Sequence, residues 1–136
     1  MIVNPAYIYM GKKMPTADLP LWSNTGYNVP ATGTDATFSN GTVVIKNGGN
    51  ISFTVSTFGF KALAVVAESY GYPYPLKMIL KVPGKPDYSL DKAIPTSATG
   101  VSYEIPAEYQ AKNAQLILQD AQYSSGKNIY SAVLKI

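Results

Sequence analysis

The chain of 136 residues contains no histidine, no cysteine and no arginine, so all eleven of its basic side chains are lysines. Histidine is the commonest general base, histidine and cysteine are the usual ligands of zinc, and arginine is best suited to bidentate phosphate recognition. Composition therefore excludes serine–histidine and cysteine–histidine nucleophile systems, and zinc sites built from imidazole or thiolate. The lack of cysteine also excludes a disulfide framework.

Charge and long apolar runs are scarce as well. Eleven lysines against eight carboxylates give a net charge of +3, and only Lys12 and Lys13 are adjacent. A scattered charge of this size favours solubility over nucleic-acid binding. No apolar run approaches the roughly 20 residues of a membrane helix. The N-terminus lacks a basic segment followed by an apolar one, so we expect no signal peptide and synthesis in a cytoplasm; a mature secreted chain is the alternative.

The residues that are abundant are tyrosine, of which there are eleven, and β-branched residues in short runs broken by Gly, Pro, Asn and Ser. Residues 1–41 carry four of the ten prolines and the only tryptophan, and they show no sustained period. We expect them to form an extended, Pro-punctuated and irregular arm, with one or two strands around residues 7–9. From residue 42 to residue 136, strand signals recur at the spacing typical of an all-β sandwich or barrel.

Individual strands are predicted from alternation between turn residues. The first two, 42–46 and 51–55, flank Asn47-Gly48-Gly49-Asn50, whose Asn and Gly supply the positive φ that a tight hairpin loop requires. Residues 60–67 are apolar on both faces, which predicts a central strand covered on both sides rather than a helix of the same length. The remaining predicted strands are 76–82, 101–105, 114–120 and 128–136, with one helical turn over 106–110.

Strands with one apolar face are most economically buried as two antiparallel sheets packed face to face. The order from residue 50 onward also resembles a known family. An alternating strand is followed by an apolar strand and then by a strand turning at Pro83-Gly84. A late Val-x-Tyr-x-Ile-Pro segment comes next, and Ser125-Gly126-Lys127-Asn128-Ile129 precedes the closing strand. This order is similar to that of the galactose-binding-like jelly rolls of carbohydrate-binding modules. The resemblance implies a jelly-roll-like antiparallel β-sandwich, with sugar sites on loops or on one sheet face. Such sandwiches also host protein docking and virion assembly.

Carboxylates are the remaining candidates for catalysis or metal binding. A two-carboxylate glycosidase needs two acids about 5–9.5 Å apart. Most of the eight acids lie beside turn residues or on the polar side of a strand, where solvated acids belong, so we expect no catalytic residue. Asp87, Asp91 and Asp120 lack the spacing of a calcium loop. We therefore expect no metal site and no cofactor, a structural calcium being the minor alternative.

Aromatic side chains are the best candidates for a binding site. Tyr70, Tyr72 and Tyr74, stiffened by two prolines in the tyrosine-rich loop (residues 69–75), can present flat amphipathic surfaces to a protein or a sugar. The alternative is a loop folded onto the end of the sandwich with its phenol oxygens in water. Trp22 is expected either to fill its own core or to dock on a neighbouring subunit, and Tyr123 is a further candidate stacking ring.

These observations predict a non-catalytic structural or interaction protein. The first hypothesis is an accessory component of a virion, a bacteriophage capsid decoration or fibre-associated protein, because a weakly charged, Tyr-rich surface suits assembly interfaces. Its partners would be neighbouring subunits or further copies of the chain. The alternative is an extracellular carbohydrate-binding module that uses the Tyr-rich loops, for example in host attachment. A glycan-active enzyme is a third, more distant hypothesis; nucleic acid and membrane are not expected partners.

Overall fold

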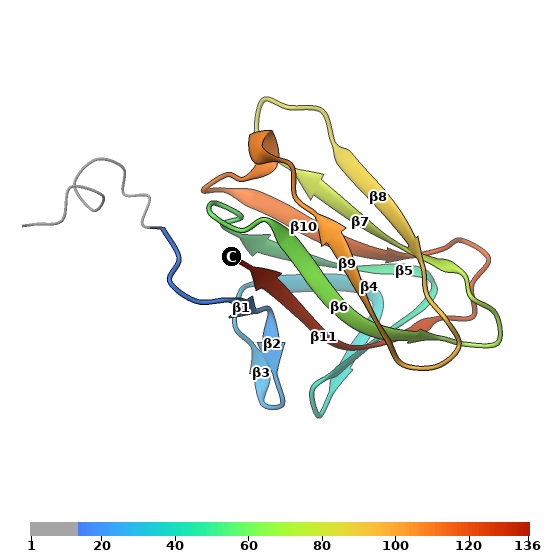
Figure 1. The fold of residues 1–136 in the computed structure, drawn as a ribbon. Coiled ribbons are helices and arrows are strands. Elements are labelled where there is room, and N and C mark those ends of the chain that lie inside the picture. The colour runs from blue at the N-terminus through green and yellow to red at the C-terminus, as the bar shows by residue number, and fades with distance from the viewer. Residues whose placement is uncertain (1–13) are drawn as a thin grey trace, which may run out of the picture.

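A computed structural model describes residues 14–136, and this part of the chain is all-β, as the sequence predicted (Figure 1). The elements in chain order are β1 (Leu19–Pro20), β2 (Trp22–Ser23), β3 (Gly26–Tyr27), β4 (Ala31–Ser39), β5 (Thr42–Val55), β6 (Ala62–Ser69), β7 (Pro75–Lys81), β8 (Tyr88–Ala93), β9 (Thr99–Glu104), the 3₁₀ turn η1 (Ala107–Tyr109), β10 (Ala114–Asp120) and β11 (Lys127–Lys135). All strand pairs are antiparallel.

The strands form a sandwich whose two layers share one long strand. The order is β8-β7-β10-β5-β11-β6-β9, with β4 beside β5 and β1 beside β11. Residues 50–55 of β5 pair with β10, whereas residues 43–45 pair with β11. β5 therefore passes from one layer to the other, with β7, β8 and β10 in the first layer and β6, β9 and β11 in the second (Figure 1).

The predicted hairpin across Asn47-Gly48-Gly49-Asn50 is wrong, because residues 42–55 are a single strand. Asn47 and Gly48 do adopt positive φ, 51° and 76°, as their residue types indicated. The positive φ values produce the bend at which β5 changes layers, and there the register with β4 shifts between Thr34 and Ala36. Local turn propensity is the same for a bend and for a reversal, so only the pairing partners distinguish the two.

The tight hairpin lies instead at Asn40 and Gly41, between β4 and β5, where φ is 48° and 84°. The expected boundary between an arm and a sandwich at residues 41 and 42 therefore falls inside this turn. β4 pairs with β5 along its whole length, but it is an edge strand with mostly exposed or half-buried residues, and so lacks the alternation that would predict it. The strand expected around residues 7–9 lies outside the described residues.

The core is built from the inward faces that alternation predicted. Ile51, Phe53 and Val55 are buried on β5, and so are the alternate residues of β7 and β10. β6 is central, between β9 and β11, but only one of its faces is covered. Leu63, Val65 and Ala67 are buried, whereas Val66 on the opposite face is 38% exposed. The expectation that β6 is covered on both sides is corrected, because small apolar residues also suit an open sheet surface.

Gly49 provides a test of the β5 bend. A Cβ at this position would lie 2.4 Å from the backbone oxygen of Thr34 and 2.9 Å from that of Lys46. Gly49→Ala is therefore expected to lower the free energy of unfolding by about 1–3 kcal/mol, measured by chemical denaturation. Gly100→Ala is the matched control, because nothing lies within 4 Å of its Cβ, and it should change stability by less than about 0.5 kcal/mol. Equal losses for the two variants would contradict this account of the bend.

Candidate functional site

The tyrosine-rich loop projects from one end of the sandwich, between β6 and β7. Tyr72 is 62% exposed, and its ring lies 5.1 Å from that of the half-buried Tyr74. Ser69 Oγ donates to the backbone oxygen of Tyr72 at 2.6 Å, and Tyr70 N–H donates to the oxygen of Gly126 at 3.1 Å. The loop is therefore hydrogen-bonded both internally and to the β10–β11 connection.

The other two predicted binding residues lie in different environments. Tyr123, in the β10–β11 connection, is 81% exposed and presents most of its ring to solvent. Trp22 is only 5% exposed; its ring stacks on that of Phe53 at 5.8 Å, and Nε1 donates to the backbone oxygen of Gly41 at 2.8 Å. Of the two alternatives for Trp22, the structure shows it filling its own core, so its ring is not offered to a ligand on the surface.

A polar network links Tyr70 to the outer face of β6 and β11. Tyr70 Oη donates to Asn128 Oδ1 at 2.8 Å, and Asn128 Nδ2 donates to Glu68 Oε1 at 3.1 Å. Tyr130 Oη donates to the same Glu68 oxygen at 2.5 Å. Asn128 and Glu68 are cross-strand partners, and Tyr130 lies where the β6–β11 register shifts. We call Glu68, Tyr70, Asn128 and Tyr130 the outer-face network.

The outer-face network sets the ionisation of its members. The Tyr130 hydroxyl, and secondarily the Asn128 amide, holds the pKa of Glu68 below its ordinary value of 4.5. The same hydrogen bond to Glu68 raises the pKa of Tyr130 above 10.0. At neutral pH Glu68 is therefore a carboxylate and Tyr130 a neutral phenol. Among the described residues none donates to Glu68 Oε2, which is left as an acceptor.

The titration of Glu68 can be measured directly. We expect its side-chain carboxyl, followed by NMR, to titrate below 4.5, and to move toward 4.5 in Tyr130→Phe because the strongest donor is lost. Because the pKa in the folded state is lowered, Glu68 supports the folded state above its unfolded pKa, and this support is lost as pH falls through the folded value. Tyr123→Phe removes a phenol outside the network and should leave the titration unchanged. A Glu68 midpoint at 4.5 in the wild type would contradict the assigned hydrogen bonds.

An apolar groove adjoins the outer-face network on the same surface. Ala64 and Val66 line the groove, and Glu68 is the next outward residue along β6. The groove is open, with a volume of about 420 Å³. It is lined by Ala64, Val65, Val66, Gly100, Val101, Ser102, Ser131, Val133 and Lys135. This face therefore combines exposed phenol rings, an apolar floor and hydrogen-bonding groups.

The outer face of the other layer differs in character, because its hollows lack aromatic residues. One hollow of about 320 Å³ includes Lys77, Asp91 and Gln119. Another, of about 430 Å³, combines Lys81 and Gln115 with the apolar Val82, Pro83 and Ala114. Neither is lined by an aromatic residue. It offers hydrogen bonds without a ring on which a ligand could stack.

The described residues give no basis for a metal or a membrane-spanning helix. No group of three or more acids, histidines or cysteines among them is arranged to hold a metal ion. Of the acids considered for calcium, Asp87 pairs with Lys81 and Asp120 with Lys127. No helix within residues 14–136 has the length and apolar character needed to cross a bilayer.

The fold of this chain is similar to that of solved structures, although its sequence matches no known family. No protein-family profile and no curated protein matches the sequence. Among solved structures, a family 29 carbohydrate-binding module superimposes with a TM-score of 0.65 at 13% identity, covering 86% of this chain and 86% of that one. A variant of a family 29 module complexed with mannohexaose gives 0.66 at 12%, over 86% and 89%. Another, complexed with cellulohexaose, gives 0.65 at 12%, over 88% and 92%. The expected resemblance to carbohydrate-binding β-sandwiches is confirmed at the level of fold.

The outer-face network was not predicted from the sequence, apart from Tyr70. Glu68 was interpreted only as a solvated acid, and Asn128 and Tyr130 only as parts of a closing strand. The register shift between Ile129 and Ser131 displaces Tyr130 from simple alternation, so no periodic signal placed its ring beside Glu68. The outward positions of β6 and β11 could have been listed from alternation, but not their pairing.

Proposed function

We propose that this chain is a non-catalytic module that binds neutral glycans on the outer face of β6 and β11. The observation that carries the proposal is the outer-face network: two exposed phenol rings joined by hydrogen bonds to a carboxylate and an amide, beside an open apolar groove. A sugar has an apolar ring face that stacks on aromatic groups and a rim of hydroxyls that needs donors and acceptors. Ligand sites commonly combine an apolar surface with a few fixed polar groups in this way.

The likeness in fold supports this proposal over the virion hypothesis. The similar structures are carbohydrate-binding modules, two of them complexed with mannohexaose and cellulohexaose, which are neutral hexose oligosaccharides. None of the comparisons supports a capsid or fibre role. Placement on a virion, docking on neighbouring subunits and self-association therefore stay predictions from the sequence, and host attachment through a glycan would be compatible with them.

The charge of the site favours uncharged sugars. Because its pKa is lowered, Glu68 is a carboxylate at neutral pH. A uronic or sialic acid placed against it would bring two negative charges together, which disfavours binding. We therefore expect neutral oligosaccharides to bind and acidic ones to be rejected, with Glu68→Gln relaxing this selectivity.

Binding is tested by titrating the folded protein with mannohexaose and cellulohexaose, measured by calorimetry. Tyr130→Ala and Tyr70→Ala are each expected to weaken binding by about tenfold or more, because each removes a stacking ring. Gln119→Ala, on the outer face of the other layer, is the matched control and should leave affinity unchanged.

Two outcomes of the titrations would contradict the proposed function or the proposed site. Failure of the wild type to bind either oligosaccharide at millimolar concentration would refute the proposed function. Binding that is lost in Gln119→Ala and kept in Tyr130→Ala would keep the function but move the site to the other layer.

A further inference from the structure

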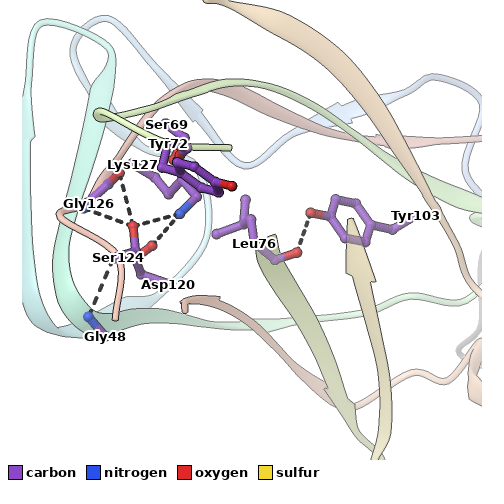
Figure 2. A network of polar contacts seen from close by, with 9 residues as sticks. All are labelled: Gly48, Ser69, Tyr72, Leu76, Tyr103, Asp120, Ser124, Gly126 and Lys127. Carbon is purple, nitrogen blue, oxygen red and sulfur yellow. Dashed lines mark hydrogen bonds and ion pairs between the residues drawn. The ribbon is translucent and has the colours of Figure 1, made fainter. Parts of the chain in front are cut away.

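The most unusual buried feature is an ion pair between Lys127, at the start of β11, and Asp120, at the end of β10 (Figure 2). Both side chains are 0% exposed, and Nζ lies 2.5 Å from Oδ1. The usual separation for such a charged hydrogen bond is about 2.7–2.9 Å. A primary amine and a carboxyl group are therefore in direct contact in a site closed to water.

The surroundings of this pair are built from two further groups. Nζ also donates to Ser124 Oγ at 2.9 Å, and the Gly48 N–H donates to the second carboxylate oxygen, Oδ2, at 3.4 Å (Figure 2). Ser124 Oγ is held in turn by the N–H of Gly126 at 3.0 Å. The amine, the carboxyl carbon and both of its oxygens are thus fixed relative to one another.

We propose that Lys127 and Asp120 condense into an intramolecular isopeptide bond. Proton transfer along the hydrogen bond from Nζ to Oδ1 gives a neutral amine and a carboxylic acid. Nζ then attacks Cγ and a C–N bond forms. The Cγ–Oδ1 bond breaks, and Oδ1, having received two protons from the original ammonium group, leaves as water. The product is a neutral amide, so the step requires no other reactant.

Each neighbouring group has a role in this step. Oδ2 carries the negative charge of the tetrahedral intermediate, and the Gly48 N–H already points at it, as a hydrogen-bond donor to an oxyanion must. Ser124 Oγ accepts from Nζ and so orients the amine beside the carboxyl group, while both protons pass from Nζ to Oδ1 along their direct hydrogen bond. Both groups contact the reacting atoms directly.

Burial supplies the driving force. Removing two charged groups from water is costly, and their mutual attraction offsets that cost only in part. Condensation removes both charges and releases a water molecule from a site that excludes solvent. The same pair on the surface would stay hydrated and ionic, as Lys81 and Asp87 do, with side chains 46% and 52% exposed.

The bond would fix the end of the sandwich that carries the tyrosine-rich loop. It would join the two ends of the β10–β11 connection, residues 120–127. The Gly126 oxygen in this connection accepts from Tyr70 N–H. The cross-link is independent of the proposed glycan binding, because its chemistry involves no residue of the outer-face network.

Mass spectrometry of the full chain tests the proposal. The purified wild-type protein is expected to be lighter than its sequence mass by one water molecule. Trypsin cleaves after unmodified lysine, so an acylated Lys127 should keep residues 113–135 in one peptide, lighter by one water. Fragmentation should assign the loss to residues 120–127. Lys127→Met should have its full sequence mass.

The rate at which water is lost tests the role of Ser124, and the mass of the wild type tests the bond itself. Ser124→Ala is expected to slow the loss of water by about tenfold or more, because it removes the hydroxyl that orients the Lys127 amine. A folded wild-type chain that keeps its full sequence mass after prolonged incubation, and that is cleaved after Lys127, would overturn the proposal whether or not the protein binds glycans.

Discussion

Replacing Trp22 with alanine is expected to lower the free energy of unfolding by about 3–5 kcal/mol, the range for removing a large buried aromatic side chain. The indole is 5% exposed and stacks on Phe53, and its Nε1 satisfies the backbone oxygen of Gly41 beside the β4–β5 turn. The substitution thus leaves a cavity and an unsatisfied acceptor together. Chemical denaturation followed by circular dichroism measures the loss without depending on tryptophan fluorescence.

Tyr123→Ala is the matched control for Trp22→Ala. It also removes an aromatic ring, but one that is 81% exposed, so stability should change by less than about 0.5 kcal/mol. If Trp22→Ala instead kept full stability and dissociated an oligomer, the ring would act between subunits, the other alternative that the sequence left open.

Breaking the Asp120–Lys127 pair is the second change expected to have a large effect. Asp120→Ala leaves the buried Lys127 amine with Ser124 as its partner, and Lys127→Met leaves the buried Asp120 carboxylate with the Gly48 N–H as its donor. Each single variant is expected to lose about 3–5 kcal/mol of unfolding free energy, because one uncompensated charge remains in a dry site. Each also lacks the proposed isopeptide bond, so wild-type protein of full sequence mass is the reference for the ion pair alone.

The double variant Asp120→Leu/Lys127→Met distinguishes charge burial from packing. It removes both charges and fills the space with apolar side chains, and we expect it to be more stable than either single variant. A double-mutant cycle in urea measures the coupling. Additive losses in the double variant would show that the two side chains stabilise the end of the sandwich independently.

Much of the fold was predictable because it depends on local alternation. Ile51, Phe53 and Val55 alternate with polar residues, and a strand with that pattern must bury one face. The strands over 76–82 and 114–120 and the single turn after Pro106 agree with the structure for the same reason. β8 and β4 were missed because their side chains are mostly exposed or half-buried, so their sequences carry little periodic signal.

The site was less predictable than the fold. Of the five candidate binding residues, Tyr70, Tyr72 and Tyr123 are exposed, Tyr74 is half-buried and Trp22 is buried. Their role in binding stays a prediction. The hydrogen bond between Glu68 and Tyr130 joins residues that are 62 positions apart in the sequence. They meet because of the register between β6 and β11, which shifts between Ile129 and Ser131. A single sequence contains the residue types for such a contact but not the register that brings them together.

By itself the sequence determined the β class, the inward faces of the central strands and the exclusion of histidine, cysteine and arginine chemistry, because these follow from composition and from period-two alternation. Tertiary structure decided which turn reverses the chain, that Trp22 fills its own core, and which polar side chains meet. Asn47-Gly48 bends β5 between layers while Asn40-Gly41 forms the hairpin, although both supply positive φ. The physical reason is that long-range strand pairing and burial, not local propensity, fix the direction of the chain and the neighbours of each side chain.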